Sequence, residues 1–204
     1  MSNAKRALLI VPALVVTGGL LIAAVNAWLA PRIEARQRQA AAAIYFDVLQ
    51  LPRASDISLR DTMTDDPALG LRASQKIIVA YRQGIAVGAV LPLTAREGYG
   101  GDIDLLLGID SAGKVTAVRA IAHNETRNLG AAIDRDNSRW LEQFRDKTFD
   151  EPEAANWQLR RDGGASDGIT GATVTSRAVI DAVREGLKYF AAHRAELMRE
   201  PINE

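Results

Sequence analysis

Cysteine is missing from the 204-residue sequence, and this absence excludes several kinds of redox centre. Without thiolates the chain can hold neither cysteine-ligated iron–sulfur clusters nor disulfides. Histidine is also scarce, because His123 and His193 are the only two, and a structural or solvated role is expected for each. No metal site is therefore predicted, whether zinc or haem. Any redox chemistry in this chain must use a bound organic cofactor.

The chain also lacks an excess of charge of either sign. Lysine plus arginine and aspartate plus glutamate each number 25, so the formal net charge is zero. No electrostatic field therefore gathers polyanions, and nucleic-acid binding is not expected. The length is sufficient for one sizeable hydrophobic core beside an anchoring segment.

An uncharged apolar run lies near the start of the chain. Residues 7–29 read ALLIVPALVVTGGLLIAAVNAWL, which as a helix at about 1.5 Å per residue exceeds a hydrocarbon core of about 30 Å. We predict a transmembrane anchor within residues 1–30, with its basic tail inside and the remaining chain outside the cytoplasm. The alternative is a cleaved signal peptide, since Val25-Asn26-Ala27 has small residues suited to a peptidase. The run, however, is longer than the roughly 7 to 15 residues typical of such signals.

Residues 31–74 are predicted to form a juxtamembrane helix and a connecting loop. Apolar residues recur near helical spacing from Ile33 to Val48, and Pro52 ends this pattern. Residues 56–74 are polar and contain proline and glycine, which favours a loop or short irregular connection.

Residues 75–204 are predicted to form one α+β domain with an antiparallel sheet and flanking helices. The β-type runs are residues 76–84, 85–95, 103–110 and 114–123. Ser111-Ala112-Gly113 separates the last two, so we expect them to pair as a hairpin. A short helix is expected around Trp140, a further strand at Trp157-Gln158-Leu159, and a long amphipathic helix from about Val174 to Arg199. This mixture favours α+β over a doubly wound sheet.

The most informative segment leads directly into the final helix. Residues 162–179 read DGGASDGITGATVTSRAV. The first-turn N–H groups of a helix have no intrahelical partners and carry partial positive charge, so a phosphoryl group is stabilised there. Gly171 permits close approach of the backbone to an anion, and the nearby hydroxyls belong to Thr170, Thr173, Thr175 and Ser176. The pattern indicates an anion site, with ordinary hydroxyl capping of a helix as the alternative.

TGATVTS, residues 170–176, closely resembles a flavinylation signature. It is similar to the signature of the FMN-binding domain in the Rnf electron transport complex G subunit and in the C subunit of the sodium-pumping NADH:quinone reductase. In those families the closing threonine of the signature bears the flavin phosphate, and Thr175 holds that position here. The resemblance implies FMN bound covalently through phosphate to Thr175. The resemblance also implies that the neighbouring residues of the signature contact the cofactor: Thr170, Gly171, Ala172, Thr173 and Ser176.

A second segment also resembles the Rnf G subunit. The family usually reads Glu-Thr-Pro-Gly-Leu-Gly, whereas this chain has Glu125-Thr126-Arg127-Asn128-Leu129-Gly130. Asparagine tolerates the left-handed backbone that glycine adopts, so the turn is retained, but the rigidity of proline is absent. The resemblance implies that this loop helps to hold the isoalloxazine ring, through Glu125, Thr126, Leu129 and Gly130.

The same resemblance implies a protein that relays electrons through its FMN within an Rnf-type complex. Such a complex couples ferredoxin and NAD redox chemistry to sodium or proton transport across the bacterial inner membrane, with this domain on the periplasmic side. The implied partners are other membrane and redox subunits, membrane lipid, and a flavin transferase that uses FAD. No catalytic residue is expected, because the cofactor carries the chemistry. The alternative is a membrane-tethered regulatory or assembly module without an essential electron-transfer role.

Overall fold

The computed structural model describes residues 28, 42–126, 130–134, 139–149 and 157–199. Apart from Trp28, the predicted anchor lies outside these residues. Within the described part of the chain, no helix combines the length and apolar character needed to cross a membrane. The chain divides into two compact units, Met1–Ile44 and Tyr45–Glu204, and the features below belong to the second.

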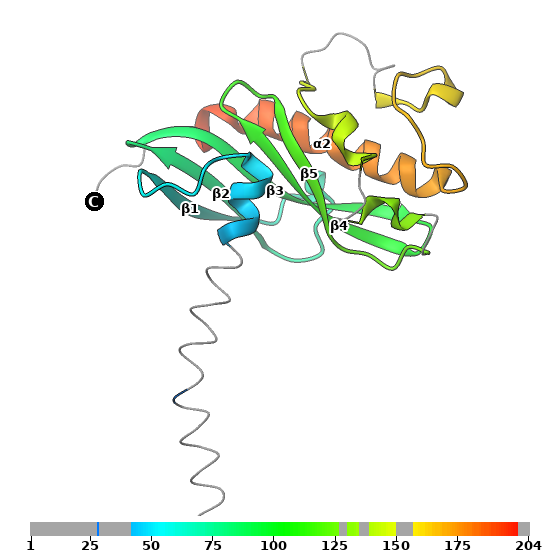
Figure 1. The fold of residues 1–204 in the computed structure, drawn as a ribbon, viewed down its shortest axis with the longest axis horizontal. Helices are drawn as coiled ribbons and strands as arrows, with labels where there is room; N and C mark the ends of the chain where they lie inside the picture. Colours follow the sequence, from blue (N-terminus) through cyan, green and yellow to red (C-terminus); the bar gives the residue numbers. More distant parts are fainter. Residues whose placement is uncertain (1–27, 29–41, 127–129, 135–138, 150–156, 200–204) are drawn as a thin grey trace, which may run out of the picture. The chain divides into compact units, whose positions relative to one another are not determined.

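Five antiparallel strands form one sheet in sequence order (Figure 1). They are β1 (Ile57–Thr64), β2 (Gln75–Arg82), β3 (Ile85–Gly98), β4 (Gly101–Asp110) and β5 (Val115–Ala122). The last four correspond to the four predicted β-type runs. The register of β4 and β5, with Leu107 opposite Val118, confirms the predicted hairpin. The α+β class with an antiparallel sheet is therefore confirmed.

Strand β1 corrects the prediction that residues 56–74 form a loop. It pairs with β2 along its whole length, from Ile57 opposite Arg82 to Thr64 opposite Gln75. Its polar composition reflects its position at the edge of the sheet, where most of its residues are at least partly exposed. The short 3-10 helix η1 (Pro67–Leu69) follows and contributes the buried Leu69 to the core.

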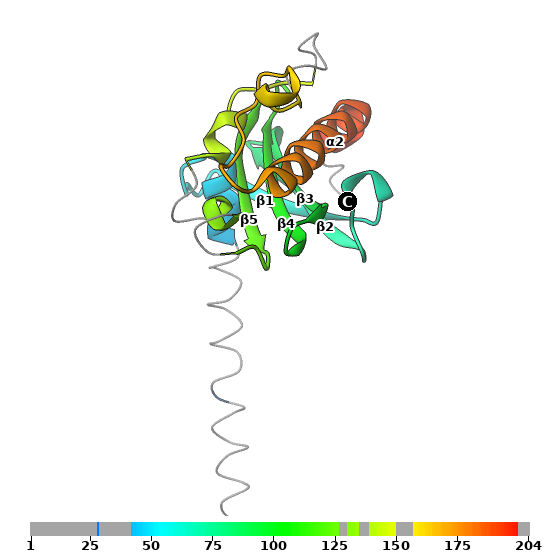
Figure 2. The same cartoon turned by 90° about the vertical axis from the view of Figure 1, so that its right-hand side faces the viewer.

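The long helix α2 (Thr173–Leu197) lies across one face of the sheet, as Figures 1 and 2 show, and confirms the predicted final helix. Leu93 of β3 and Leu107 of β4 lie close beneath it, because a methyl group added at Gly186 would come within 2.8 Å of both side chains. The helix residues buried in the core include Val179, Ile180, Val183, Leu187 and Phe190. Full burial of one such side chain stabilises a fold by about 1.5–3 kcal/mol. This layer therefore fixes the start of α2 relative to the sheet.

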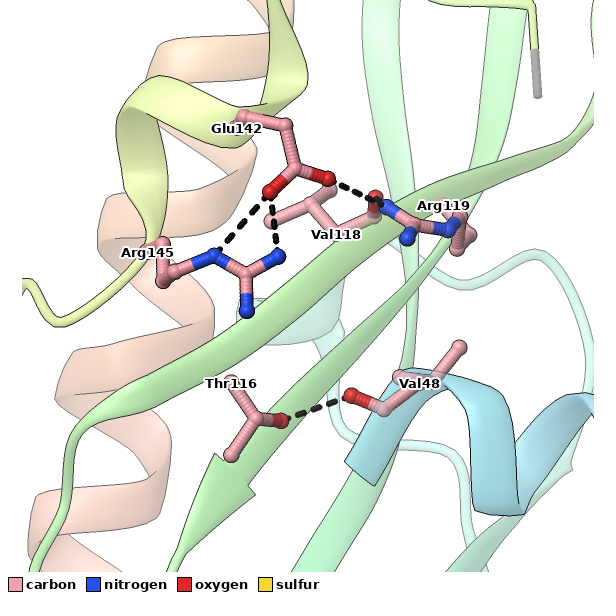
Figure 3. Close-up of polar contacts among 6 residues, drawn as sticks. All are labelled: Val48, Thr116, Val118, Arg119, Glu142 and Arg145. Atoms are coloured by element: carbon pink, nitrogen blue, oxygen red, sulfur yellow. Dashed lines mark hydrogen bonds and ion pairs between the residues drawn. The ribbon is translucent and has the colours of Figure 1, made fainter. Parts of the chain in front are cut away.

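The opposite face of the sheet is covered by residues 45–49, the last turn of a shorter helix (Figure 2). Val48 and Leu49 are buried there. The hydroxyl of Thr116 on β5 donates a 2.7 Å hydrogen bond to the carbonyl oxygen of Val48 (Figure 3). The predicted helix ending before Pro52 is confirmed over these described residues.

The helix predicted around Trp140 is one 3-10 turn, η3 (Leu141–Phe144). Its Glu142 carboxylate accepts hydrogen bonds from Arg145 Nε at 3.0 Å and from Arg119 Nη1 of β5 at 3.4 Å (Figure 3). The Arg145 hydrogen bond holds the pKa of Glu142 below its usual value, while partial burial acts in the opposite direction. These contacts hold η3 against the sheet.

No strand forms at Trp157-Gln158-Leu159, which corrects another prediction. Leu159 makes only an isolated bridge to Ser166. The alternation of apolar and polar residues that favoured a strand has a different cause: Trp157 and Leu159 both pack into the core from an irregular segment. The Trp157 ring stacks on Phe144, with ring centroids 6.3 Å apart. A further 3-10 turn, η5 (Arg160–Asp162), follows and leads toward α2.

Candidate functional site

The chain enters α2 through a tight turn at Gly171. This residue has φ of 79°, a left-handed conformation that glycine adopts without strain. The N-cap residue of α2 is Ala172, and it makes no side-chain hydrogen bond to the first turn. Ordinary hydroxyl capping at the N-cap, the alternative raised by the sequence, is therefore not what this helix uses. The first-turn N–H groups remain without a capping side chain from that position.

The Ser176 hydroxyl stabilises this turn through two hydrogen bonds. Its hydroxyl accepts a hydrogen bond from the Ile169 N–H at 2.9 Å and donates one to the Ala172 carbonyl at 2.8 Å. The side chain is fully buried, as Ala172 nearly is. The structure thus places both of these predicted cofactor contacts inside the protein, where Ser176 shapes the turn.

The Thr175 hydroxyl is also turned into the protein. The residue is 0% exposed, and its Oγ1 donates a 2.7 Å hydrogen bond to Oε2 of Glu125. The structure therefore brings together two residues that the sequence placed in separate parts of one predicted site. In this conformation the Thr175 oxygen is shielded from solvent.

Thr173 differs from Thr175 in both exposure and partner. It is half-buried, in the first turn of α2, and its Oγ1 accepts a 3.0 Å hydrogen bond from Nη1 of Arg161. The adjoining Thr170 and Gly171 are both exposed. The accessible part of the predicted signature is therefore the turn itself and the first two helical residues, Thr173 and Val174, with an arginine beside Thr173.

Glu125 occupies a confined position below the start of α2. It is 8% exposed, and its Oε1 accepts a 2.9 Å hydrogen bond from the N–H of Gly100. Gly130 approaches it so closely that an added methyl group would lie 2.2 Å from Oε2. Thr126 is exposed, and Leu129 lies outside the described residues. The loop thus supplies one buried carboxylate to the site, with Gly130 packed against it.

His123 supports this loop. Its Nδ1 accepts a 3.2 Å hydrogen bond from the Glu125 N–H, and its Nε2 lies 2.6 Å from Oδ1 of Asp134. If Nδ1 accepts, the ring proton is on Nε2 and points to the carboxylate. These contacts agree with the structural role expected for this histidine. Arg161 was not predicted as a site residue, because an exposed arginine has no distinguishing sequence pattern.

Open hollows lie beside these elements, and two of them adjoin the predicted site. One, of about 480 Å³, includes Gly100, His123 and Asn124 and therefore adjoins the Glu125 loop. The other, of about 440 Å³, lies between η1, β3 and α2, and includes Val174, whose exposed fraction is 49%. Both volumes are within the range of ordinary small-molecule sites.

Comparisons with known proteins connect this site with a flavin. Residues 98–188 match the family model of the FMN-binding domain. Several relatives are named as the G subunit of an ion-translocating oxidoreductase complex. The Pseudomonas aeruginosa relative is 37% identical over 181 residues, which cover 87% of this chain and 84% of the relative. The Shewanella oneidensis relative is 33% identical over 193 residues, which cover 94% and 90% respectively.

Other matches are shorter or concern the fold alone. An Aliivibrio fischeri protein of the same name is 39% identical over 139 residues, and the match spans just under two thirds of its length, 66%. The crystal structure of Shewanella oneidensis NqrC is similar with a TM-score of 0.58, covering 80% of this chain and 98% of that one. At 12% identity this similarity shows a shared fold.

Proposed function

Because the chain belongs to the Rnf G family, the G subunits of ion-translocating oxidoreductase complexes, we propose that it is a membrane-anchored flavoprotein that relays electrons through a covalently bound FMN. The observation that carries the proposal is the TGATVTS turn at the start of α2, within the segment that matches an FMN-binding domain. FMN supplies one- and two-electron chemistry when bound, and the protein positions it and tunes its surroundings.

The residues at the start of α2 fit the phosphate end of such a cofactor. The N-cap side chain leaves the first-turn N–H groups uncapped, and the nearby Arg161 guanidinium adds a positive charge. Backbone donors, the helix dipole and a guanidinium are the chemistry that phosphate oxygens favour. The hollow of about 480 Å³ beside the Glu125 loop offers room for a ring system on the side that the family resemblance implies.

Thr175 is the residue to which we assign the ester, in agreement with the flavinylation signature. Its hydroxyl lies 2.7 Å from a carboxylate oxygen of Glu125, and a base at that distance is what activates a hydroxyl as a nucleophile. The side chain is fully buried, so a transferase can reach it only after the segments that cover it have moved. Attachment therefore requires local opening of the protein around Thr175.

Thr173 is the competing hydroxyl. It is half-buried and more accessible, but its hydrogen-bond partner is the guanidinium of Arg161, which cannot accept a proton. The Arg161 position suits a phosphate oxygen better than it suits the activation of a hydroxyl. Thr173 and Arg161 are accordingly assigned to the surroundings of the phosphate.

Covalent attachment has a simple physical advantage in this setting. A noncovalent site empties when the free cofactor is scarce, whereas an ester keeps the site filled at any concentration. The proposal includes an anchor in residues 1–30, a domain on the periplasmic side of the bacterial inner membrane, and a flavin transferase as the maturation enzyme. The other subunits of the complex would provide ferredoxin and NAD chemistry and the path for sodium or protons.

The decisive experiment is intact-mass spectrometry of the full chain, matured in a host that contains the transferase. We expect an added FMN phosphoryl mass that survives denaturation, and peptide mapping should place it on Thr175. Thr175→Ala should abolish it, whereas Thr173→Ala should retain it. Modification that maps to Thr173 would move the attachment to the accessible hydroxyl, and an unmodified native chain would refute covalent flavinylation altogether.

The alternative, a regulatory or assembly module, makes a different prediction about the assembled complex. If the flavin relays electrons, replacing the modified threonine should abolish ferredoxin-to-NAD electron transfer while the complex still assembles. Unchanged electron transfer in an assembled, flavin-free complex would favour the assembly role.

A further inference from the structure

Among the residues that the structure describes, Glu125 has the carboxylate that contacts the hydroxyl to which the proposed function assigns FMN attachment. Its Oε2 accepts the hydrogen bond from Thr175 Oγ1 at 2.7 Å. Building on that proposed function, we propose that Glu125 is the general base of flavinylation: it takes the Thr175 proton while the phosphoester forms. The chain would thus supply part of the catalytic machinery for its own modification.

The carboxylate of Glu125 is held in the orientation that this role needs. Its Oε1 is occupied by the Gly100 N–H at 2.9 Å, which leaves Oε2 directed at the Thr175 hydroxyl. The Glu125 N–H donates to His123 Nδ1, and the same ring contacts Asp134 through Nε2. A base must lie within hydrogen-bond reach of the proton it removes, and this pair meets that condition before any transferase binds.

The other hydroxyls in the first turn of α2 have different partners. Ser176 donates to the Ala172 carbonyl, which is not a base that can take its proton. Thr173 accepts from the Arg161 guanidinium. Of these three hydroxyls only Thr175 donates to a carboxylate, so the structure distinguishes the nucleophile from its neighbours by its partner.

Three glycines enclose the buried Glu125 carboxylate. Gly98, Gly100 and Gly130 approach so closely that an added methyl group would lie within 2.8 Å of a neighbouring atom of the segment 124–125. Because these positions have no side chains, their backbone packs directly against the segment 124–125, and this packing has to open before FAD can reach the Thr175 hydroxyl. Glu125 can act as the base only if its contact with Thr175 persists during this opening.

The proposed step balances without any oxidation or reduction. The bond between Thr175 Oγ1 and the FMN phosphorus forms, and the bond joining that phosphorus to the AMP portion of FAD breaks. AMP departs with the bonding electron pair, and the hydroxyl proton passes to Oε2 of Glu125. The carboxyl is then neutral beside the anionic phosphodiester, so repulsion between two negative charges is avoided.

The charged and titratable groups around this step come from three elements. His123 and Asp134 lie on the side of the Glu125 loop, and Arg161 of η5 lies beside Thr173 at the start of α2. A guanidinium near the transferred phosphoryl group would stabilise its oxygens without removing a proton. Proton removal is therefore assigned to Glu125 alone.

The test uses the purified, unmodified full-length chain in detergent, the flavin transferase and FAD, with flavin incorporation followed by intact mass. Glu125→Gln removes the base and keeps the shape, whereas Glu125→Asp keeps a carboxylate but withdraws it from the hydroxyl. Glu142→Gln is the control, because Glu142 is an exposed carboxylate that pairs with Arg119 of β5 and with Arg145, the C-cap residue of η3. Melting temperatures of the unmodified proteins show whether each variant is folded.

We expect Glu125→Gln to lower kcat about 100-fold with the KM for the protein within about twofold of wild type, the scale of general-base catalysis. The kcat of Glu125→Asp should lie between those of wild type and Glu125→Gln. The kcat of Glu142→Gln should remain within about twofold of wild type.

A merely structural role would raise the KM for the protein, and that result would overturn the role of Glu125. An unchanged kcat in Glu125→Gln would overturn it as well, and so would wild-type attachment at Thr173. All of these outcomes leave covalent flavinylation intact. A wild-type chain that never acquires flavin would refute the proposed function itself, so the two failures are distinguishable.

Discussion

Thr175 and Glu125 are separated by fifty residues in the sequence and joined by a hydrogen bond of 2.7 Å in a buried setting. The bond connects the first turn of α2 with the loop that follows β5. Because Gly100 donates to the other carboxylate oxygen, three separate segments converge on one buried group. The position of the helix start is thus coupled to the loop predicted to hold the flavin ring.

Thr175→Ala should destabilise the unmodified protein by about 1–3 kcal/mol, because the buried Glu125 carboxylate loses a donor. Thr175→Ser retains the hydroxyl and should recover most of that loss. Urea unfolding of the unmodified chain measures the difference. A double-mutant cycle with Glu125→Gln should show coupling between the two sites, and strictly additive effects would mean that the bond contributes nothing.

Gly130→Ala tests the close packing against Glu125. The added methyl group would lie 2.2 Å from Oε2 and 2.9 Å from the Glu125 Cβ atom, so the carboxylate must move. We expect a loss of about 1–3 kcal/mol in unfolding free energy, typical of overpacking. Gly168→Ala is the control, because its added methyl group would meet Leu159 Cδ2 at an ordinary 3.4 Å. Similar stabilities of the two variants would contradict the predicted clash.

Ser176→Ala should loosen the turn that precedes α2. The change removes the acceptor of the Ile169 N–H and the donor to the Ala172 carbonyl, at a site without solvent access. The expected cost is about 1–3 kcal/mol for leaving buried polar groups unpaired. Amide hydrogen exchange should accelerate at Ile169, whereas the middle of α2 at Val183 should keep its protection. Unchanged exchange at Ile169 would show that the hydroxyl does not hold the turn.

The sheet and the final helix could be predicted because their local patterns agree with their tertiary environment. Strands β2 to β5 carry apolar runs bounded by turn residues, and α2 carries an apolar stripe at helical spacing. Strand β1 could not be predicted from the sequence, because its own residues are mostly polar and exposed and its pairing depends on the partner strand β2. Trp157 and Leu159 produced a false strand pattern, since irregular segments can also bury alternate residues.

The predicted cofactor segments could be located from the sequence, but the orientation of their side chains could not. The hydroxyls of Thr173, Thr175 and Ser176 look alike in the sequence, as donors near one anion. Their environments differ because successive helix residues point about 100° apart. Thr173 is half-buried beside Arg161. The hydroxyls of Thr175 and Ser176 point into the protein, where Thr175 bonds to the distant Glu125 and Ser176 bonds to Ala172 in the preceding turn. Only the packing of α2 on the sheet decides between them.

Glu142 provides a prediction about pH. Its hydrogen bond with Arg145, and secondarily its contacts with Arg119, lower its folded-state pKa relative to the usual 4.5. A carboxyl with a lowered pKa stabilises the fold above its unfolded value, and that contribution disappears as the pH falls through the lower folded value. Glu142→Gln should therefore reduce stability slightly at neutral pH, by less than about 1 kcal/mol because the pair is partly solvated.

The difference between wild type and Glu142→Gln should narrow once the pH falls below about 4.5 and vanish at lower pH, where the wild-type carboxyl is also protonated. Thermal unfolding of both proteins over a range of about pH 3 to 7 measures this difference. Because Arg145 is the hydrogen-bond partner of Glu142, the stability of Arg145→Gln relative to wild type should change with pH in a similar way. A difference that stays constant across the range would mean that Glu142 acts through packing, since protonation cannot then be what removes its contribution.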